Sequence, residues 1–316
     1  MSEIVTVGEL LVDVLAETVG QALSAPGRYL GPFPSGAPAI FADQAARLGI
    51  KTAIAGAVGD DAFGKAVLAR LGQSGVDISA VRVLEDATTG VAFATYFADG
   101  SREFLFHMKD AAPGRFRAED VSPALFAGCR IFHIMGSSLF SAPMIAAITR
   151  AIALAEQAGA LISFDPNIRP ALLRTPGVAE AIHAIARRSD ILMPSEIDLA
   201  FLCPGEEVEA ALTTLLSWRA ARVFLKLGAA GSRYADRNQR LSAPPFASTE
   251  IDPTGAGDCA GATFLASWLR DMPIERCLAR ANAAGALAVA QRGPMEGNSD
   301  EAILEAFLVE RKNVLF

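Results

Sequence analysis

One short stretch of the chain combines residue types that phosphate chemistry needs. Residues 252–264 read DPTGAGDCAGATF, in which Gly255, Ala256 and Gly257 directly precede Asp258. Small and apolar residues follow at helical spacing, which predicts a helix that begins at the glycine turn. The free N–H groups of such a helix start bind anions. An acid is also favoured there as a helix cap, so Asp258 is either a cap or a chemical group.

The chemical interpretation of Asp258 follows from its neighbours. A carboxylate among N–H donors repels a phosphate unless it has a task, and one task fits: accepting the proton of a hydroxyl that attacks phosphorus. The segment also matches G-x-G-x-x-A, but the polar ASTEID precedes it where a dinucleotide fold needs a buried strand. No lysine followed by serine or threonine completes a Walker-type phosphate loop.

The composition limits the partners of the chain. Its 316 residues are 52% hydrophobic and 20% charged with a net charge of −7, which argues against nucleic acid and anionic membranes because both need clustered Lys and Arg. The N-terminal MSEIVTVGELLVDV lacks the basic region of a signal peptide, and no apolar run approaches the roughly 20 residues that span a bilayer. The four cysteines form no CxxC pair. We expect a cytoplasmic protein.

Short apolar runs alternate with amphipathic segments along most of the chain. This order is typical of βαβ units, so we expect an α/β fold with a doubly wound, mostly parallel sheet. The expected strands are 4–7, 52–58, 130–135, 160–165, 190–193 and 222–227. The expected helices are 37–48, 61–73, 141–158, 177–188, 205–220, 258–270, 274–291 and 299–311.

Two stretches depart from this alternation. Residues 90–107, GVAFATYFADGSREFLFH, read as two strands around a DGSR turn, and residues 16–35 are rich in glycine and proline. In α/β enzymes such excursions serve as lids over a site at the carboxyl ends of the strands, and a surface ornament is the alternative. We expect one domain, 1–316, with a small β-stranded lid near 10–35 and 88–110.

Taken together, the motifs resemble those of the ribokinase-like (PfkB) carbohydrate kinases. DPTGAGDCAGATFLASWL resembles the C-terminal signature of that family, and other matches follow in the family's order over essentially the whole chain. They are GELLVD (8–13), SGAPAIFADQAARLG (35–49), GAVGDDAFG (56–64), FDPNIRPAL (164–172), KLGAAG (226–231) and ANAAGALAV (281–289). The resemblance is to the branch of fructokinases, 2-keto-3-deoxygluconate kinases and tagatose kinases, and it implies an ATP-dependent sugar kinase.

The resemblance assigns catalytic and substrate-binding residues. Asp258 matches the family's catalytic base, and the backbone N–H groups of Gly255, Ala256 and Gly257 match its anion hole. Asp13, placed at the end of the first expected strand, matches an aspartate that binds sugar hydroxyls. The other residues expected to bind substrate are Ser35, Gly36, His107, Lys109, Asn167 and Arg169.

Asn167 and Arg169 can also be placed from the sequence pattern. DPNIR begins where an expected strand ends, so both residues should lie outside the carboxyl edge of the sheet, where open α/β sheets bind ligands. The guanidinium of Arg169 offers a planar fork for a carboxylate or a phosphate, and a surface salt bridge is its other interpretation.

The same resemblance implies ATP and Mg²⁺ as ligands of the site, and K⁺ as an activating ion. A polar residue in the apolar ANAAGALAV helix, Asn282, is expected to be buried beside the adenine. The residues assigned to the nucleotide are Ser195, Lys226, Gly228, Gly231 and Asn282. Those assigned to the monovalent cation are Asp252, Thr254, Ala288 and Gly293, and Asp198 is assigned to magnesium through water.

Three positions depart from the family pattern. Ser35 and Ile40 stand where relatives carry a glycine and a sugar-binding asparagine. In PSEID (194–198), Ser195 and Asp198 replace the usual Asn and Glu but keep a hydroxyl and a carboxylate. At the lid exit, relatives that act on 2-keto-3-deoxygluconate carry aromatic and arginine residues, whereas this chain has His107 and Lys109.

These observations predict a kinase that phosphorylates a hydroxyl, expected to be primary, of a monosaccharide. A ketohexose is the expected acceptor, and a 2-keto-3-deoxy sugar acid is the alternative. A nucleoside fits less well, and a sugar sensor without turnover would have no need of Asp258. The apolar hairpin, with Val91, Phe93 and Thr95 on one side and Ala92, Ala94 and Tyr96 on the other, could also pair with a second subunit and form a homodimer through the lid.

Overall fold

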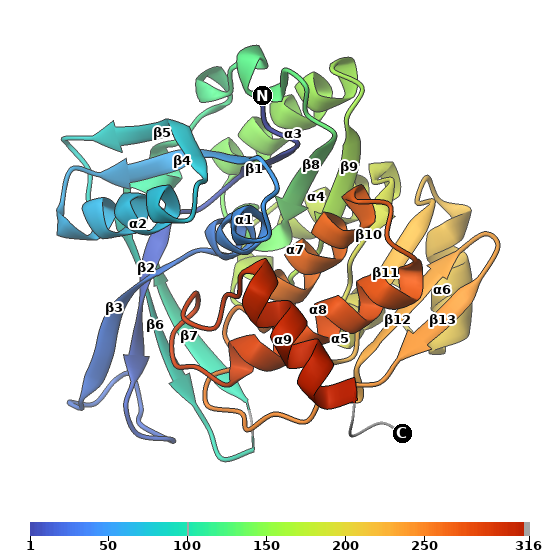
Figure 1. Ribbon diagram of the computed structural model, residues 1–316. Helices are drawn as coiled ribbons and strands as arrows, with labels where there is room; N and C mark the ends of the chain where they lie inside the picture. The colour runs from blue at the N-terminus through green and yellow to red at the C-terminus, as the bar shows by residue number, and fades with distance from the viewer. Residues whose placement is uncertain (100, 313–316) are drawn as a thin grey trace.

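A large sheet forms the centre of the molecule in the computed structural model, which describes residues 1–99 and 101–312 (Figure 1). Its strand order is β13-β12-β11-β10-β9-β8-β1-β4-β5, and every pairing from β11 to β5 is parallel. This confirms the mostly parallel α/β fold. Its strands are β1 (Ile4–Val7), β4 (Thr52–Gly59), β5 (Asp77–Leu84), β8 (Ile131–Met135), β9 (Leu161–Asp165), β10 (Ile191–Leu192), β11 (Arg222–Lys226), β12 (Ser232–Asp236) and β13 (Arg240–Ala243).

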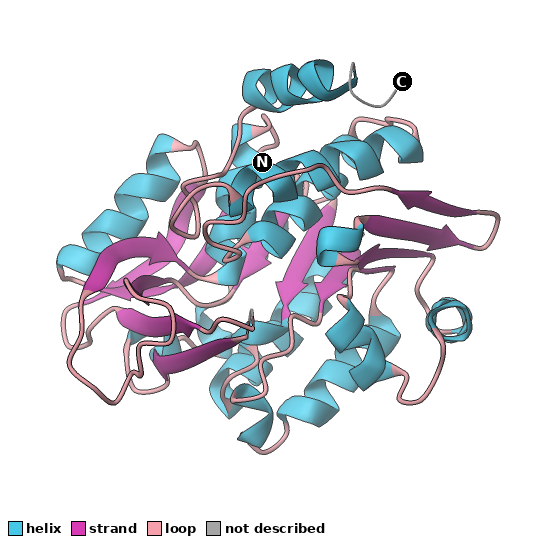
Figure 2. Ribbon diagram, turned by 90° about the horizontal axis from the view of Figure 1, so that it is seen from below, coloured by secondary structure: helices cyan, strands magenta, loops and turns pink. Residues whose placement is uncertain are grey.

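Helices cover both faces of this sheet (Figure 2). One face packs against α1 (Ala37–Arg47), α2 (Ala62–Gln73), α7 (Ala256–Leu269) and α8 (Ile274–Val289), with α9 (Glu301–Lys312) outside α8. The other face packs against α3 (Ala142–Gln157), α4 (Val178–Arg188) and α6 (Val208–Ser217). None of the helices in the described part of the chain is long and apolar enough to cross a membrane.

Burial on both faces explains why the central strands are largely apolar. In β1, Val5 and Val7 pack into the core beneath α3, whereas Ile4 packs into the core beneath α1 and α7. Successive side chains point to opposite faces of a strand, and both faces are covered here. Each parallel strand therefore needs mostly apolar residues at consecutive positions. Buried polar exceptions include Thr6, His133 and Ser163, the last two of which hydrogen-bond to each other, and β9 and β11 end in the charged Asp165 and Lys226.

A second sheet of four strands stands off the first, and we call it the lid. Its order is β3-β2-β6-β7, formed by β2 (Leu11–Ala16), β3 (Tyr29–Ser35), β6 (Gly90–Tyr96) and β7 (Arg102–His107). The expected hairpin 90–107 is present, and Gly100 of its expected turn lies outside the described residues. The prediction that 16–35 is irregular is wrong for β3, because an edge strand tolerates the prolines of YLGPFPS.

Several other elements differ from the sequence prediction. The expected helix 205–220 is the shorter α6, and a separate helix, α5 (Glu196–Leu202), precedes it. Strands β5, β12 and β13 were not expected, because their half-exposed residues lack the apolar runs of the central strands. Asp13 lies within lid strand β2 and not at the end of the first strand.

Candidate active site

The carboxyl ends of the central strands open into a cavity of about 750 Å³. Strand β9 ends at Asp165 and β11 ends at Lys226, so the loops that follow them line it. The structure brings many of the expected residues together there: Asn167, Arg169, Ser195, Asp198, Lys226, Gly228, Gly231, Gly255, Ala256, Gly257, Asp258 and Asn282 all line this cavity. This is the position at which open α/β sheets bind ligands.

Asp258 lies in the first turn of α7 and is almost completely buried, with 6% of its surface exposed. Its Oδ1 accepts a hydrogen bond from Asn167 Nδ2 at 3.1 Å. Burial and the charge of Asp165 raise the pKa of Asp258 to about 7, although Lys226 and Arg169 act in the opposite direction. A carboxylate with a pKa near neutrality is suited to accept a proton from a hydroxyl.

The loop after β9 holds Asn167 in a strained backbone conformation. Its φ of 40° lies in the left-handed region, which asparagine tolerates better than most residues, and its backbone N–H donates to Asp165 Oδ1 at 3.1 Å. Lys226 Nζ forms an ion pair with the other oxygen of the buried Asp165. Together these contacts fix the side chain of Asn167 against Asp258 and keep a positive charge beside the cavity.

Glycine is required at the start of α7 for two reasons. Gly255 has a φ of 81°, and a Cβ placed there would lie 2.4 Å from the carbonyl oxygen of Pro294. Gly257 is different, because its nearest protein atom would be Lys226 Nζ at 3.6 Å from an added Cβ. The space in front of Gly257 is therefore open to a ligand, beside the N–H groups of the helix start.

Asp13 lies on the lid, within the electrostatic reach of Asp252 and Arg169, and is not among the residues that line the cavity. It is buried, and burial together with the nearby charge of Asp252 raises its pKa to about 7, whereas Ser35 and Arg169 lower it. Gly36 follows Ser35 and has a φ of 108°, and a Cβ there would lie 2.3 Å from the carbonyl oxygen of Glu9. Ile40 is buried in the core beside Gly255 and offers no polar group to a sugar.

Ser195 and Asp198 form a capping box at the start of α5. Asp198 Oδ2 accepts from the backbone N–H and the hydroxyl of Ser195, both at 2.7 Å, and Asp198 Oδ1 accepts from the backbone N–H of Ile168 at 2.8 Å. Asp198 therefore fixes the loop that carries Asn167. The capping role was not foreseen from the sequence.

The residues expected to bind the nucleotide line the same cavity. Gly228 and Gly231 form the loop after β11, and Gly231 has a φ of 91°. The prediction of a buried Asn282 is wrong: it is half-buried, and its amide donates to the carbonyl oxygens of Ala243 and Pro244 at 3.2 and 2.8 Å. The strand β13 that supplies Ala243 was not expected, so this partner could not be found from the sequence.

The residues expected to hold a monovalent cation lie close to the start of α7. Asp252 Oδ1 accepts from the backbone N–H of Thr254 at 3.0 Å, and Asp252 Oδ2 accepts from the backbone N–H of Gly293 at 2.9 Å. The carbonyl oxygen of Ala288, at the end of α8, accepts from the backbone N–H of Gln291 at 3.2 Å. Asp252 is buried and takes part in no ion pair within residues 1–99 and 101–312.

The structure places His107 and Lys109 away from the cavity that holds Asp258. Both are exposed and line a different cavity, together with Asp61 and Thr89. In the register of β6 and β7, His107 pairs with Val91, whereas Asp13 pairs with Ala92. Because side chains alternate between faces, His107 points to the side of the lid opposite Asp13.

The same alternation places Tyr96, Arg102 and Phe104 on the face of the lid that points toward the body. The sequence prediction did not name them as site residues. Tyr96 pairs with Arg102 and Ala94 pairs with Phe104, on the same face of the lid as Asp13. Arg102 lines the cavity, and the Cζ atoms of Arg102 and Arg169 lie 6.0 and 5.8 Å from the ring centroid of Phe104. Partial burial and the charge of Arg169 lower the pKa of Arg102.

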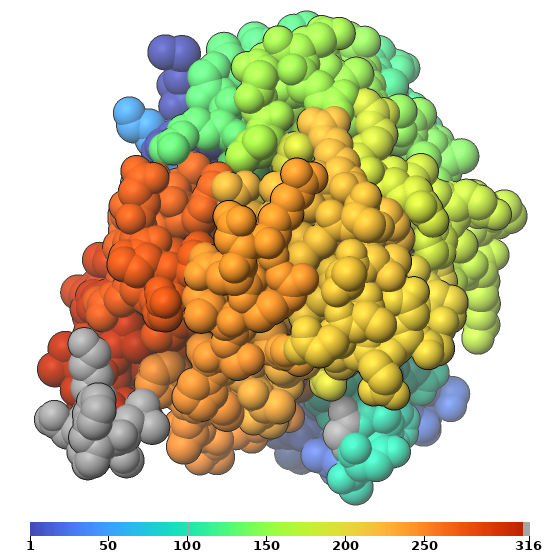
Figure 3. All heavy atoms as spheres, turned by 90° about the vertical axis from the view of Figure 1, so that its right-hand side faces the viewer, coloured from blue at the N-terminus to red at the C-terminus, as the bar shows by residue number. Residues whose placement is uncertain are grey.

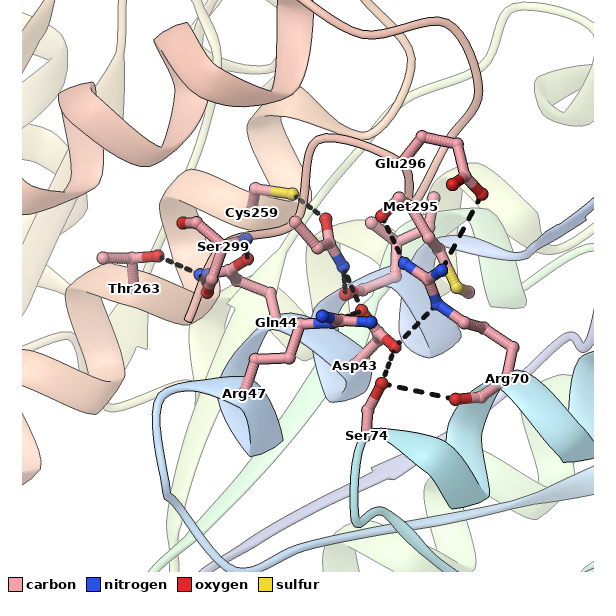
Figure 4. Close-up of polar contacts among 12 residues, drawn as sticks. Asp43, Gln44, Arg47, Arg70, Ser74, Cys259, Thr263, Met295, Glu296 and Ser299 are labelled. Atoms are coloured by element: carbon pink, nitrogen blue, oxygen red, sulfur yellow. Dashed lines mark hydrogen bonds and ion pairs between the residues drawn. The ribbon is translucent and has the colours of Figure 1, made fainter. Parts of the chain in front are cut away.

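A buried polar network lies behind α7 and fixes its neighbours (Figure 4). Asp43 of α1 accepts from Arg70 Nε of α2 at 3.2 Å and from Asn298 Nδ2 at 2.7 Å. Cys259 Sγ donates to Asn298 Oδ1, and burial holds the pKa of Cys259 well above its ordinary value. The network joins α1, α2, α7 and the loop that follows Gly293, and it makes Cys259 an unreactive thiol.

Comparison with known proteins agrees with this geometry. The model of the pfkB family of carbohydrate kinases matches residues 1–301. The chain belongs to the pfkB carbohydrate kinase family. It is therefore a phosphotransferase whose acceptor is an alcohol group of a carbohydrate.

Individual relatives of this pfkB kinase cover nearly its whole length. It is 34% identical to Fructokinase-1 of Zea mays over 95% of both chains. An E.coli structure in complex with ATP and Mg²⁺, provisionally described as Ribokinase II, has a TM-score of 0.92 and 42% identity, covering 98% of this chain and all of the other. A double-mutant fructokinase from Vibrio cholerae O395, with fructose, ADP and potassium bound, has a TM-score of 0.84 and 27% identity over 98% of both chains.

Proposed function

We propose that this kinase transfers the γ-phosphate of ATP to a primary hydroxyl of a ketohexose. The observation that carries the proposal is Asp258, a buried carboxylate at the mouth of α7 with a pKa raised to about 7. The fructokinases among the relatives support a ketohexose as the class of acceptor.

In the proposed reaction the sugar lies between the lid and the body. Asp13 binds sugar hydroxyls, and the ionised Asp258 accepts the proton of the attacking hydroxyl. Asn167 orients the Asp258 carboxylate through its 3.1 Å hydrogen bond. A bond forms between the sugar oxygen and the γ-phosphorus, the bond to the bridging oxygen breaks, and ADP leaves. The N–H groups at the start of α7 and the charge of Lys226 stabilise the negative charge on the transferring group.

Mg²⁺, when bound, neutralises negative charge on the phosphate oxygens. Within the described residues, no group of three or more His, Cys, Asp or Glu side chains comes together that could hold a metal ion. This fits an ion held mainly by phosphate oxygens and water, which is the usual arrangement for Mg²⁺. Asp198, which already accepts several hydrogen bonds, would contact such an ion through water.

We also propose that the segment around Asp252 binds K⁺. The donors that would surround the ion are the buried carboxylate of Asp252, the hydroxyl of Thr254 and the carbonyl oxygens of Ala288 and Gly293, and oxygen donors suit hard cations. A thermal-shift titration with KCl, against the chloride of a bulky organic cation, tests this. The melting temperature should rise with K⁺ in the wild type and stay constant in Asp252→Asn.

A 2-keto-3-deoxy sugar acid is the second candidate acceptor. One observation favours it: neither Arg102 nor Arg169 forms an ion pair with any residue that the structure describes, although both line the cavity. Two unpaired guanidinium groups can bind a carboxylate. The same two groups can also contact the phosphates of ATP.

One experiment separates these acceptors and tests the proposed function. ADP release from MgATP, in the presence of K⁺, is measured with fructose, tagatose, 2-keto-3-deoxygluconate and a nucleoside, and Asp258→Asn provides the blank. We expect a rate far above the blank with a ketohexose. Turnover of the sugar acid alone would replace the ketohexose with the second candidate, and turnover of the nucleoside alone would contradict both.

We further propose a homodimer through the outer face of the lid. The face with Ala92, Ala94 and Tyr96 turns toward the body, which leaves the face with Val91 and Phe93 for a partner subunit. Leu105 on that outer face is 46% exposed. An exposed apolar sheet surface is stabilised when a second copy covers it.

A further inference from the structure

One tyrosine of the lid reaches directly to the body of the molecule. The hydroxyl of Tyr96, at the end of β6, donates to Asp252 Oδ1 at 2.6 Å and lies 2.7 Å from Thr254 Oγ1. In Figure 3 the tip of the lid, in blue and teal, emerges at the lower edge of the molecule near orange residues of the C-terminal half. A carboxylate can only accept a hydrogen bond, so the phenol of Tyr96 is the donor in its contact with Asp252.

The carboxylate that receives this hydrogen bond joins three segments. Besides the hydroxyl of Tyr96, Asp252 accepts the backbone N–H groups of Thr254 and Gly293. Thr254 directly precedes Gly255, the residue at which α7 and its anion hole begin. The position of the lid is therefore linked through one buried side chain to the segment that binds the transferring phosphoryl group.

Tyr96 also shares its face of the lid with the sugar-binding residue Asp13. Asp13 of β2 pairs with Ala92 of β6, and Tyr96 lies four positions after Ala92 in β6. Because an even spacing keeps side chains on one face of a sheet, Asp13 and Tyr96 both point toward the body. A movement of the lid as a unit would therefore carry Asp13 and Tyr96 together.

We propose that Tyr96 is a positioning residue that latches the closed lid onto the Asp252–Thr254 segment, so that enclosure of the sugar and ordering of the phosphate site occur together. This rests on the proposed function, in which the sugar binds between lid and body. Loss of the latch shifts the lid toward its open state, and a ligand that needs the closed state then binds more weakly by the same factor. A hydrogen bond to a charged group is worth about a factor of ten.

The test compares two variants that each lose one phenolic hydroxyl from the lid. Tyr96→Phe removes the latch and keeps the ring. Tyr29→Phe is the matched control, because the Tyr29 ring packs edge-on against Phe93 at 5.9 Å and its hydroxyl has no hydrogen-bond partner within the described residues. Both variants keep the aromatic packing of the lid, so a difference between them reports on the hydroxyl of Tyr96.

Two measurements are made on these proteins. Amide hydrogen exchange of β6 and β7 in the absence of substrates should be about tenfold faster in Tyr96→Phe and unchanged in Tyr29→Phe. In steady-state kinetics, Tyr96→Phe should raise the KM for the sugar about tenfold and leave kcat and the KM for ATP within about threefold.

Two results would overturn the proposal. Unchanged lid exchange together with an unchanged sugar KM means that Tyr96 holds nothing in place. A parallel loss of kcat, of both KM values and of melting temperature means that Tyr96 supports the fold in general. If the wild type phosphorylates no sugar, the proposed function fails, and the exchange comparison, which needs no substrate, still decides the latch.

Discussion

The body of this kinase holds Asp258 through its own fold, whereas the lid reaches the site only with side chains on one face of a sheet. On the body side, β9, β11 and α7 end or begin at the cavity, and their terminal residues are fixed by short-range contacts such as Asn167 with Asp258. On the lid side, the strand register alone decides that Tyr96 and Arg102 face the body and His107 does not. The body should therefore control chemistry, and the lid should control binding.

The largest effect is expected on the body side. Asp258→Asn should lower kcat by roughly 10²–10⁴-fold because the amide cannot accept the proton of the attacking hydroxyl. Turnover and ATP binding are measured separately, and ATP binding should persist. Asp86→Asn is the matched control, since Asp86 lies on the surface in an exposed ion pair with Arg115. A kcat for Asp258→Asn close to that of the control would remove Asp258 from the mechanism.

A smaller effect is expected where body and lid meet. If the acceptor carries a carboxylate, Arg169→Ala and Arg102→Ala should each raise its KM roughly 10- to 100-fold, because each removes a charged hydrogen-bond donor, and should change a neutral ketohexose much less. The measurement is the ratio of kcat/KM for the two acceptors in each variant. Equal losses on both acceptors would instead indicate that the arginines contact ATP.

The burial of Asp258 should also affect how the melting temperature of the protein depends on pH. Its pKa is raised from 3.8 to about 7, so between these pH values the folded protein keeps a proton that the unfolded chain releases. Stability due to this group therefore falls as the pH rises through this window, and above about pH 7 the ionised carboxylate destabilises the fold. Asp258→Asn should melt at a higher temperature than the wild type near pH 8, and the difference should shrink toward pH 4. A wild type that is the more stable protein near pH 8 would contradict the raised pKa.

The smallest effect on catalysis is expected on the outer face of the lid. Leu105→Asp places a charge in the proposed dimer contact and should produce a monomer, because a buried unpaired charge is costly. Light scattering coupled to size-exclusion chromatography measures the mass, with the exposed Val83→Asp in β5 as control. A monomeric wild type would exclude the dimer.

The sequence predicted well those parts of the site that depend on local structure. Asp258 and Gly255 lie at a helix start, and Asn167 follows the end of a buried strand, so periodicity and glycine positions were enough to locate them. The central strands were found for a similar reason, since burial on both faces makes them largely apolar.

The parts that failed depend on contacts between distant segments. The sequence prediction chose His107 on β7 and missed Arg102, because the choice of face requires the pairing of Tyr96 with Arg102. The chain enters the lid twice, and β2 pairs with β6 across more than 70 residues, so Asp13 was assigned to the wrong strand. Asn282 was expected to be buried beside a nucleotide, whereas its amide donates to Ala243 at the end of β13 and to Pro244, and β13 was not foreseen.

The pH dependence of kcat/KM for the sugar tests most directly the claim that Asp258 is the base. The rate of the wild type should rise with pH and level off around the pKa of about 7 that burial gives Asp258. The residual rate of Asp258→Asn should show no such rise. If the variant keeps the same midpoint, a different group titrates in the reaction and the assignment of Asp258 as the base is wrong.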